Sequence, residues 1–362
     1  MLSRGDTHAS IRLDTDPDRA RRKLKTLDRE FQKELAKVIR PPRVAYIVTG
    51  HGERTTTPRE NDPPGLRDLK EMLTFLNYKV EMLGLKEGLS ERVPEDATVV
   101  IVAGPRSPFL EAELQALDDY VKGGGSLLLL LDPEKERDLE IDPLLETLGI
   151  TFSDAVLANE RQHIRFTRGK KDRAFLFTNQ ISRHDSTNVL RKLGLRGLVL
   201  CYLCGSIEKR AELPPVKAGG PDVQLTVRSM SGTWADLDGD FEFDPETEKK
   251  ATYALTAAIE LPSGDPEQPA GRAIVAADAD IVSDLILRKS PGNQQWLADA
   301  LHWLEREVEL SGEVAAVEDV PVLHTQEQDK AWFYGTILGV PLLILVFGFF
   351  VSGIRRKRRG SE

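Results

Sequence analysis

The chain has 362 residues and a formal net charge of −9, from 49 basic and 58 acidic side chains. Apart from one N-terminal segment no basic face offsets this charge, so we do not expect nucleic acid as a partner. Two cysteines are too few for a disulfide-rich scaffold. The length leaves room for two domains or one elaborated domain.

The N-terminal segment, residues 1–40, predicts an amphipathic helix between Asp16 and Arg40. Its other face is rich in Lys and Arg, which indicates a solvated face, with contact to a partner or anionic lipid as the alternative. Pro41-Pro42 ends the helix. The apolar positions that recur at spacings of three and four are Leu24, Leu27, Phe31, Leu35 and Val38.

Residues 41–150 alternate between strand and helix patterns. Ser107 is expected to cap the second of three helices, with Pro108 in its first turn. Continuous apolar strands separated by helices indicate a doubly wound, mainly parallel α/β sheet that is buried on both faces. The predicted strands are 44–49, 79–83, 98–103 and 126–131, and the predicted helices are 66–76, 107–122 and 142–148.

The pattern loosens over residues 151–262, which we interpret as an α+β insertion or second lobe. Residues 263–311 then add a strand at 272–277 and a helix at 293–307 that complete the α/β body. Residues 231–248 are rich in Asp, Glu and Gly and predict a loop. The short strands expected in the insertion are 151–157, 164–167, 174–177, 223–229 and 253–261, with a short helix at 186–193.

The cysteines form one Cys201-Tyr202-Leu203-Cys204 motif within an apolar run. A CxxC motif is compatible with a redox pair, a short disulfide in a body outside the cytoplasm, or a plain buried pair. A thioredoxin-type pair opens a helix after a strand, whereas the flanking Val199-Leu200 and Gly205 indicate a strand and a turn. We therefore favour a buried pair over a catalytic one.

The C-terminal region predicts a membrane anchor. After a linker at 312–330, residues 331–354 carry no charged side chain, and a helix of this length spans about 36 Å, enough to cross a bilayer core. A buried core helix is the alternative. The side chains expected at the membrane interfaces are Trp332 and Tyr334 at the start and, in the basic tail at 355–362, Arg355, Arg356, Lys357, Arg358 and Arg359.

The charges that flank this helix predict its orientation. The positive-inside rule places the basic tail in the cytoplasm and the body outside, in the periplasm. Residues 1–6 contain no apolar signal-peptide core. We expect an export signal upstream of this start, with a tail-anchored cytoplasmic body as the alternative. Gly335 and Gly339 form a GxxxG motif, which permits a homodimer through the anchor or docking on a permease.

Five polar residues follow predicted strands, at the edge where open α/β sheets bind ligands. They suit a metal site or an acid–base pair, but strand-end Asp and Gly also commonly shape turns. We expect no catalytic residue, metal or cofactor here, and treat the five as candidates for ligand or partner binding. They are His51, Glu53, Asp132, Asp278 and Asp280.

Several motifs resemble, in order, the gliding-motility auxiliary family, an uncharacterised ABC-type transport system component. The resemblance covers about residues 30–310. It rests on Val44 to Glu53 with its GHGE turn, Val100 to Pro105, Glu113 to Tyr120, Gly123-Gly124, Leu129 to Pro133, Ser231 to Ala235, Ala277 to Asp280, Asn293 and Trp303-Leu304.

The resemblance implies a glutamine-amidotransferase-like or flavodoxin-like fold and a non-enzymatic auxiliary subunit beside an ABC permease and a separate ATPase. The chain has no GxxxxGK[ST] phosphate loop, so we do not expect it to hydrolyse ATP. No predicted strand end of the α/β block offers a nucleophilic Cys or a G-x-S-x-G turn, and Cys201 and Cys204 lie outside that block. Relatives usually carry an N-terminal membrane helix, which is not visible here.

Two other functions stay open at this point. One is a membrane-tethered hydrolase or carbohydrate-binding protein that uses His51 and the acidic residues. The other is a cytoplasmic, tail-anchored adaptor. Convergence of the strand-end residues in a pocket would favour the enzyme, and protease accessibility of the body would identify the adaptor.

Overall fold

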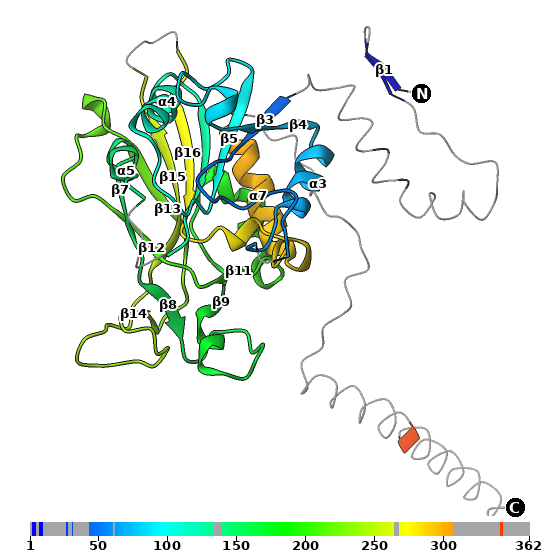
Figure 1. Cartoon of the computed structure of the whole chain (residues 1–362). Coiled ribbons are helices and arrows are strands. Elements are labelled where there is room, and N and C mark those ends of the chain that lie inside the picture. The colour runs from blue at the N-terminus through cyan, green and yellow to red at the C-terminus, as the bar shows by residue number, and fades with distance from the viewer. Residues whose placement is uncertain are drawn as a thin grey trace, which may run out of the picture. The chain divides into compact units, whose positions relative to one another are not determined.

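A mixed sheet forms the centre of the molecule (Figure 1). The computed structural model describes residues 43–60, 62–133, 139–263 and 268–306, with isolated stretches at 2–4, 7–9, 27, 31 and 341–342. Within these residues the sheet has ten strands. The main strand order is β10-β13-β15-β16-β6-β5-β3-β4, and β12 and β7 branch from β15.

Five strands form the parallel part of the sheet. They are β3 (Arg43–Val48), β4 (Tyr78–Leu83), β5 (Ala97–Ala103), β6 (Ser126–Leu130) and β16 (Gly271–Ala276). The antiparallel part contains β7 (Ile150–Ser153), β10 (Gln180–Ile181), β12 (Ser206–Lys209), β13 (Asp222–Arg228) and β15 (Ala254–Leu261). The prediction of a parallel α/β sheet is confirmed for the first group, while the antiparallel extension was not predicted.

Helices cover both faces of the parallel strands. The apolar side chains of β6 alternate, with Leu128 and Leu130 in the core shared with α3 (Arg67–Phe75) and α7 (Pro291–Leu304). Leu127 and Leu129 pack in the second core, with α4 (Glu111–Lys122) and α5 (Asp142–Thr147). A strand between two helical layers must be apolar on both sides, which explains why the sequence of β6 is a continuous apolar run.

Smaller two-stranded sheets lie beside the main one. β8 (Val156–Asn159) pairs with β14 (Thr233–Asp236), and β9 (Phe175–Thr178) pairs with β11 (Val199–Tyr202). Figure 1 shows β8, β9 and β14 together at the lower end of the molecule. We call these strands and their loops, 160–173 and 236–253, the distal lobe. The remaining elements are α6 (Asn188–Leu193) and an N-terminal pair, β1 (Leu2–Arg4) with β2 (Thr7–Ala9).

Three local predictions were wrong. Ser107 does not cap α4, because the helix begins at Glu111 and Leu110 takes the N-cap position. Residues 164–167 form a turn instead of a strand, since the Asp172 carboxylate binds the amides there. The acidic segment 231–248 contains β14, whose partner β8 lies far away in the sequence.

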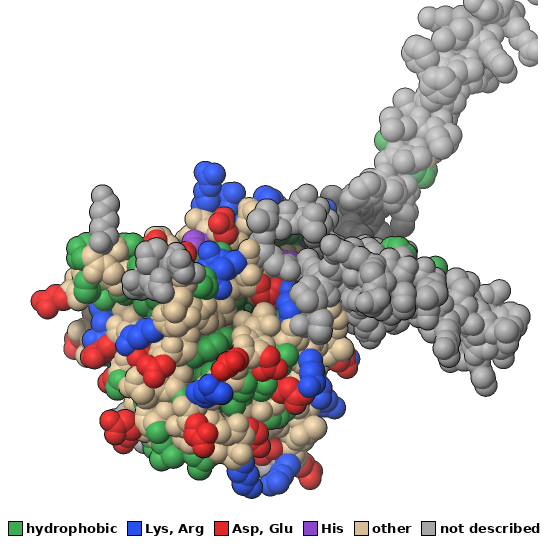
Figure 2. Space-filling view, turned by 90° about the horizontal axis from the view of Figure 1, so that it is seen from above, with side chains coloured by type: hydrophobic (Ala, Val, Ile, Leu, Met, Phe, Trp, Pro, Cys, Tyr) green, Lys and Arg blue, Asp and Glu red, His purple; other side chains and the backbone are tan. Residues whose placement is uncertain are grey.

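The predicted anchor at 331–354 lies outside the described residues except for Pro341 and Leu342. Its basic tail and nearly all of the predicted N-terminal helix at 16–40 lie outside them as well. In the part of the chain that the structure describes, no helix has the length and apolar character needed to span a bilayer. On the face shown in Figure 2, acidic and basic side chains are interspersed, and the drawn side chains form no continuous basic patch.

Candidate functional site

The carboxyl ends of β3, β5, β6 and β16 meet at one edge of the sheet and position the candidate site. Backbone hydrogen bonds continue past the strands, from Gly104 N–H to the Leu130 carbonyl and from Leu131 N–H to the Ala276 carbonyl. Arg54 N–H is likewise donated to the carbonyl of Ala103, the last residue of β5. The loops that follow the four strands are thereby held against one another.

The first group of side chains, which we call the histidine cluster, contains His51, Glu53 and Glu113. His51 Nδ1 lies 3.0 Å from Glu53 Oε1, and Nε2 lies 2.8 Å from Glu113 Oε2. All three residues are buried. Both ring nitrogens therefore face carboxylate oxygens, which only accept hydrogen bonds when ionised.

Loop contacts fix the imidazole further. The Phe109 ring stacks on it at 4.0 Å between centroids. The His51 carbonyl accepts the N–H groups of Arg106 and Ser107, and Glu113 Oε2 also accepts the N–H of Leu110. The histidine cluster therefore ties the turn after β3 to the start of α4.

The second group, which we call the arginine cluster, contains Arg54, Asp132, Asp278 and Asp280. Arg54 Nη2 donates to Asp132 Oδ2 at 2.8 Å, and its Nη1 lies 3.2 Å from Asp280 Oδ1. Asp132 Oδ1 accepts the N–H of Ala279, which joins the end of β6 to the turn after β16. Three carboxylates thus surround one buried guanidinium.

Burial and mutual repulsion shift the titration of this cluster. Burial, followed by the negative charges of Asp280 and Asp132, raises the pKa of Asp278 well above its ordinary value. Burial also raises the pKa of Asp280, although Arg54 opposes the shift. Burial disfavours the Arg54 cation, but the three carboxylates outweigh this and raise its pKa. The arrangement favours a cluster that keeps at least one carboxyl group neutral.

Glycine is required where β5 ends beside this cluster. Gly104 has φ of +63°, in the left-handed region, and a Cβ atom there would lie 2.7 Å from Asp132 Oδ2 and 3.1 Å from Ala279 Cβ. Asp132 is the member of the cluster most open to solvent, with 22% of its side chain exposed against 10% for Asp280.

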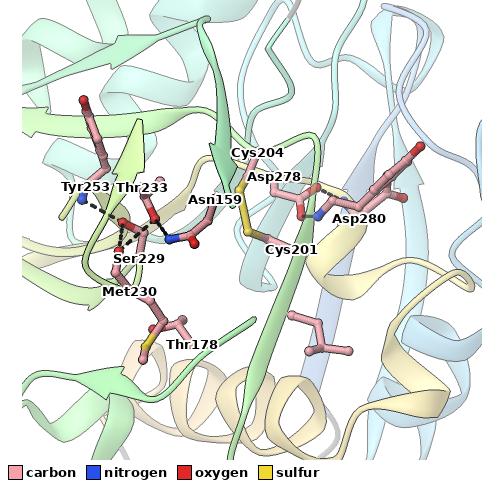
Figure 3. Close-up of a disulfide and its surroundings, with 12 residues drawn as sticks. Asn159, Thr178, Cys201, Cys204, Ser229, Met230, Thr233, Tyr253, Asp278 and Asp280 are labelled. Carbon is pink, nitrogen blue, oxygen red and sulfur yellow. Dashed lines mark hydrogen bonds between the residues drawn. A yellow bond between two sulfur atoms is a disulfide. The ribbon is translucent and has the colours of Figure 1, made fainter. Parts of the chain in front are cut away.

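The CxxC motif adjoins the arginine cluster. Cys201 on β11 and Cys204 in the following turn form a disulfide and are buried. Figure 3 shows Asp278 beside this pair, and the N–H of the intervening Tyr202 is donated to Asp278 Oδ2 at 2.8 Å. The motif lies outside the α/β block in the sequence, but the fold returns it to the strand ends.

All five predicted residues therefore lie at the strand ends, in two adjacent clusters. Sequence reasoning missed Arg54 and Glu113 as members. A signal for Arg54 was its position directly after Glu53, and a signal for Glu113 was its place in the first turn of a predicted helix. Most polar atoms of these residues bind one another or the backbone, whereas Arg54 Nε and Glu113 Oε1 are buried without a hydrogen-bond partner among the described residues.

A separate group of carboxylates lies in the distal lobe. Among the described residues, Asp236, Asp238 and Asp240 place ligand oxygens within 4.8 Å of one another, close enough to share a cation. The same oxygens also accept N–H groups of Gly239, Phe241 and other residues of the loop, which shapes it without an ion.

Comparison with known proteins identifies the family. The sequence profile of the ABC-type uncharacterized transport system family matches residues 42–303, which include every strand of the main sheet. The chain belongs to this family. It is an auxiliary component of an ABC-type transport system.

The chain is also similar to other known proteins. A stretch of 98 residues is 34% identical to the mouse intraflagellar transport protein 52 homolog, covering 26% of this chain and 22% of that protein. The structure of the N-terminal domain of mmIFT52 aligns with a TM-score of 0.51 at 16% identity, over 75% of this chain and 99% of that one. A ThuA-like protein from Bacteroides uniformis aligns with a TM-score of 0.41 at 12% identity, over 74% and 93%.

Proposed function

We propose that this auxiliary component is a non-enzymatic, membrane-anchored subunit whose α/β body binds a partner or a ligand outside the membrane, in a transport system of the gliding-motility type. The apolar segment at 331–354 would hold the body beside an ABC permease, and ATP hydrolysis would belong to a separate subunit. Membership of the transport family and the charge asymmetry around the apolar segment support this assignment.

One observation carries the non-enzymatic part of the proposal. The candidate acids and bases at the strand ends are bound to one another, as His51 is to Glu53 and Glu113, and Arg54 to Asp132. A general acid or base must reach its substrate directly or through one water. Side chains that satisfy one another are better suited to holding the loops of a binding surface in one shape.

The buried disulfide supports an extracytoplasmic body. Disulfides persist in oxidising compartments and are rare in the cytosol. The body would then lie in the periplasm and the basic tail at 355–362 in the cytoplasm.

Co-purification tests the main proposal. The full-length tagged chain, expressed in its own host and extracted with detergent, should co-purify with one ABC permease and one ATPase subunit. A deletion of residues 331–362 should abolish this association. A full-length chain that leaves the membrane without detergent, with no transporter subunit attached, would refute the proposal.

One observation favours a hydrolase as the second candidate. The strand-end acids do converge, and burial raises the pKa of both Asp278 and Asp280, a direction that is common for carboxyl groups at catalytic sites. Turnover of aryl glycosides or aryl esters that is lost in Asp280→Asn would favour the enzyme. Equal, background-level turnover in both proteins would favour the binding subunit.

A further inference from the structure

A basic loop of the distal lobe presents an aromatic side chain to solvent. The loop spans residues 160–173, which we call the basic loop, and follows β8. Phe166 at its centre is 78% exposed, one of the most exposed large apolar side chains in the described part of the chain. The exposed cations around it are Arg161, Arg165, Arg168, Lys170 and Lys171.

A buried carboxylate fixes the shape of this loop. Asp172 Oδ2 accepts the N–H groups of Phe166 at 2.9 Å and Arg168 at 2.7 Å, and Oδ1 accepts the N–H and the hydroxyl of Thr167. These bonds hold Arg168 in the left-handed region, with φ of +61°. Phe166 is therefore exposed by a turn that is held by hydrogen bonds, and its exposure does not require the loop to unfold.

Part of the positive charge of the loop is neutralised within the lobe. Lys170 lies 2.9 Å from Glu242, and Arg173 pairs with Glu160 at 3.1 Å and approaches Glu242 at 3.7 Å. Glu242 belongs to the neighbouring acidic segment, which also carries Asp238 and Asp240.

Three guanidinium groups of the basic loop keep their charge available. Within the described residues, Arg161, Arg165 and Arg168 make no ion pair. Lys171 lies over the Tyr202 ring at 5.9 Å from its centroid, and no acidic side chain in the described part of the chain forms an ion pair with it. The loop therefore offers an aromatic ring bordered by cations that can meet a negatively charged surface.

We propose that the basic loop docks the body on a bilayer that contains anionic phospholipid, with Phe166 entering the interface and the three arginines contacting lipid phosphates. Aromatic and basic side chains together favour such an interface. A stable protein interface buries about 800 Å² on each partner around an apolar core, and one phenylalanine does not provide that core. A diffuse negative surface needs no matching pocket.

This inference rests on the proposed membrane anchor. A loop with few contacts binds lipid weakly when the protein is free, whereas an anchor in the same bilayer raises its effective concentration greatly. Membrane insertion of the anchor and docking of the loop are nevertheless separate events, and each has its own measurement.

The test uses the full chain inserted into vesicles of phosphatidylcholine, with or without 30 mol% phosphatidylglycerol, at low salt. The fluorophore NBD is attached at Gly169→Cys, where a Cβ atom would meet only Thr167 Oγ1, at 3.3 Å, within 4 Å. The native cysteines are in the disulfide and do not react without reductant. We expect blue-shifted, stronger emission in the anionic vesicles alone, and its loss in high salt, which screens exposed charges.

Two pairs of variants in this background give matched comparisons. Arg165→Gln/Arg168→Gln should lower the equilibrium constant for loop docking at least about tenfold, given the attraction of an anionic surface for each cation. Arg191→Gln/Lys192→Gln removes the same charge from α6 and should leave docking unchanged. Phe166→Ser should also lower it, while Leu195→Ser, at another apolar side chain that is 79% exposed, should not.

The outcomes separate the alternatives. Equal emission in both kinds of vesicle, or equal losses in the loop and α6 variants, would overturn the proposal. A change that arises only when permease and ATPase are inserted together with the chain would also overturn it, in favour of a protein partner. Flotation with phosphatidylcholine vesicles alone reports the anchor, so a chain that floats but shows no lipid-dependent emission contradicts the loop inference and leaves the anchor intact.

Discussion

Arg54 is the residue whose side chain holds the loops at the strand ends together. It is 6% exposed and is the cation of a cluster with Asp132, Asp278 and Asp280. A buried charge is stabilising only while its partners remain, because removing one partner leaves the other desolvated and unpaired. The carboxylates in turn hold the turns after β6 and β16.

Replacement of this arginine should therefore be costly. Arg54→Met leaves Asp132 and Asp280 without their cation, and we expect a loss of about 3–5 kcal/mol in the free energy of unfolding. Urea unfolding of the full chain in detergent measures this loss. The control is Arg67→Met, because Arg67 pairs with Asp284 at 3.4 Å with 71% of its side chain exposed, and should cost less than about 1 kcal/mol. Equal losses in the two variants would contradict the assignment.

The basic loop and the N-terminal turn of α4 show how single carboxylates organise elements. Glu113 joins α4 to His51, and Asp172 closes the turn that carries Phe166. Asn293 does the same on α7, where its amide exchanges hydrogen bonds with both backbone groups of Leu200 on β11.

The carboxylate in the basic loop gives a prediction about acid and protease sensitivity. Burial opposes ionisation of Asp172, but hydrogen bonds from Thr167, Arg168 and Phe166 outweigh it and lower its pKa to about 2. A lowered pKa means that its contribution to loop stability is complete above the ordinary value of 3.8 and is lost as pH falls through about 2. The amides of Phe166 and Arg168 should therefore stay protected from hydrogen exchange as the pH falls, until it reaches about 2.

Substitution should remove this protection at neutral pH. Asp172→Asn leaves a single acceptor oxygen for the loop amides, so trypsin should cleave after Arg165 and Arg168 several times faster than in the native chain. Asp119→Asn, at an exposed carboxylate on α4, serves as the control. Unchanged cleavage in Asp172→Asn would show that other contacts hold the loop.

The molecule as a whole combines an internally bonded sheet edge with a lobe that carries separate basic and acidic loops. Both parts lie within residues 42–303, which the family profile matches. The proposed location outside the cytoplasm would put the disulfide in an oxidising compartment.

The location of the body can be tested on intact cells. An extracytoplasmic body should be digested by protease added to spheroplasts, and maleimide-polyethylene glycol should label Cys201 and Cys204 of the denatured chain only after reduction. A cytoplasmic protein followed in the same sample controls for lysis. A body that is protected from protease and labelled without reductant would instead identify a cytoplasmic, tail-anchored adaptor.

The amino-acid sequence by itself determined the parallel α/β part of the body. Continuous apolar runs such as β6 and periodic helices such as α3 are local signals, and parallel strands bring their carboxyl ends to one edge. This is why the order of strands and helices along the chain was enough to predict that His51, Asp132 and Asp280 lie at the same edge.

Only the tertiary structure decided how these residues are partnered. His51 meets Glu113 across 62 positions of the chain, Arg54 meets Asp132 across 78, and the N–H of Ala279 reaches Asp132 across 147. Such pairs depend on which loops pack against each other, and periodicity over a few residues carries no information about that packing. The same holds for β14, which lies in the acidic segment 231–248 and forms a strand because β8 supplies its hydrogen-bond partners.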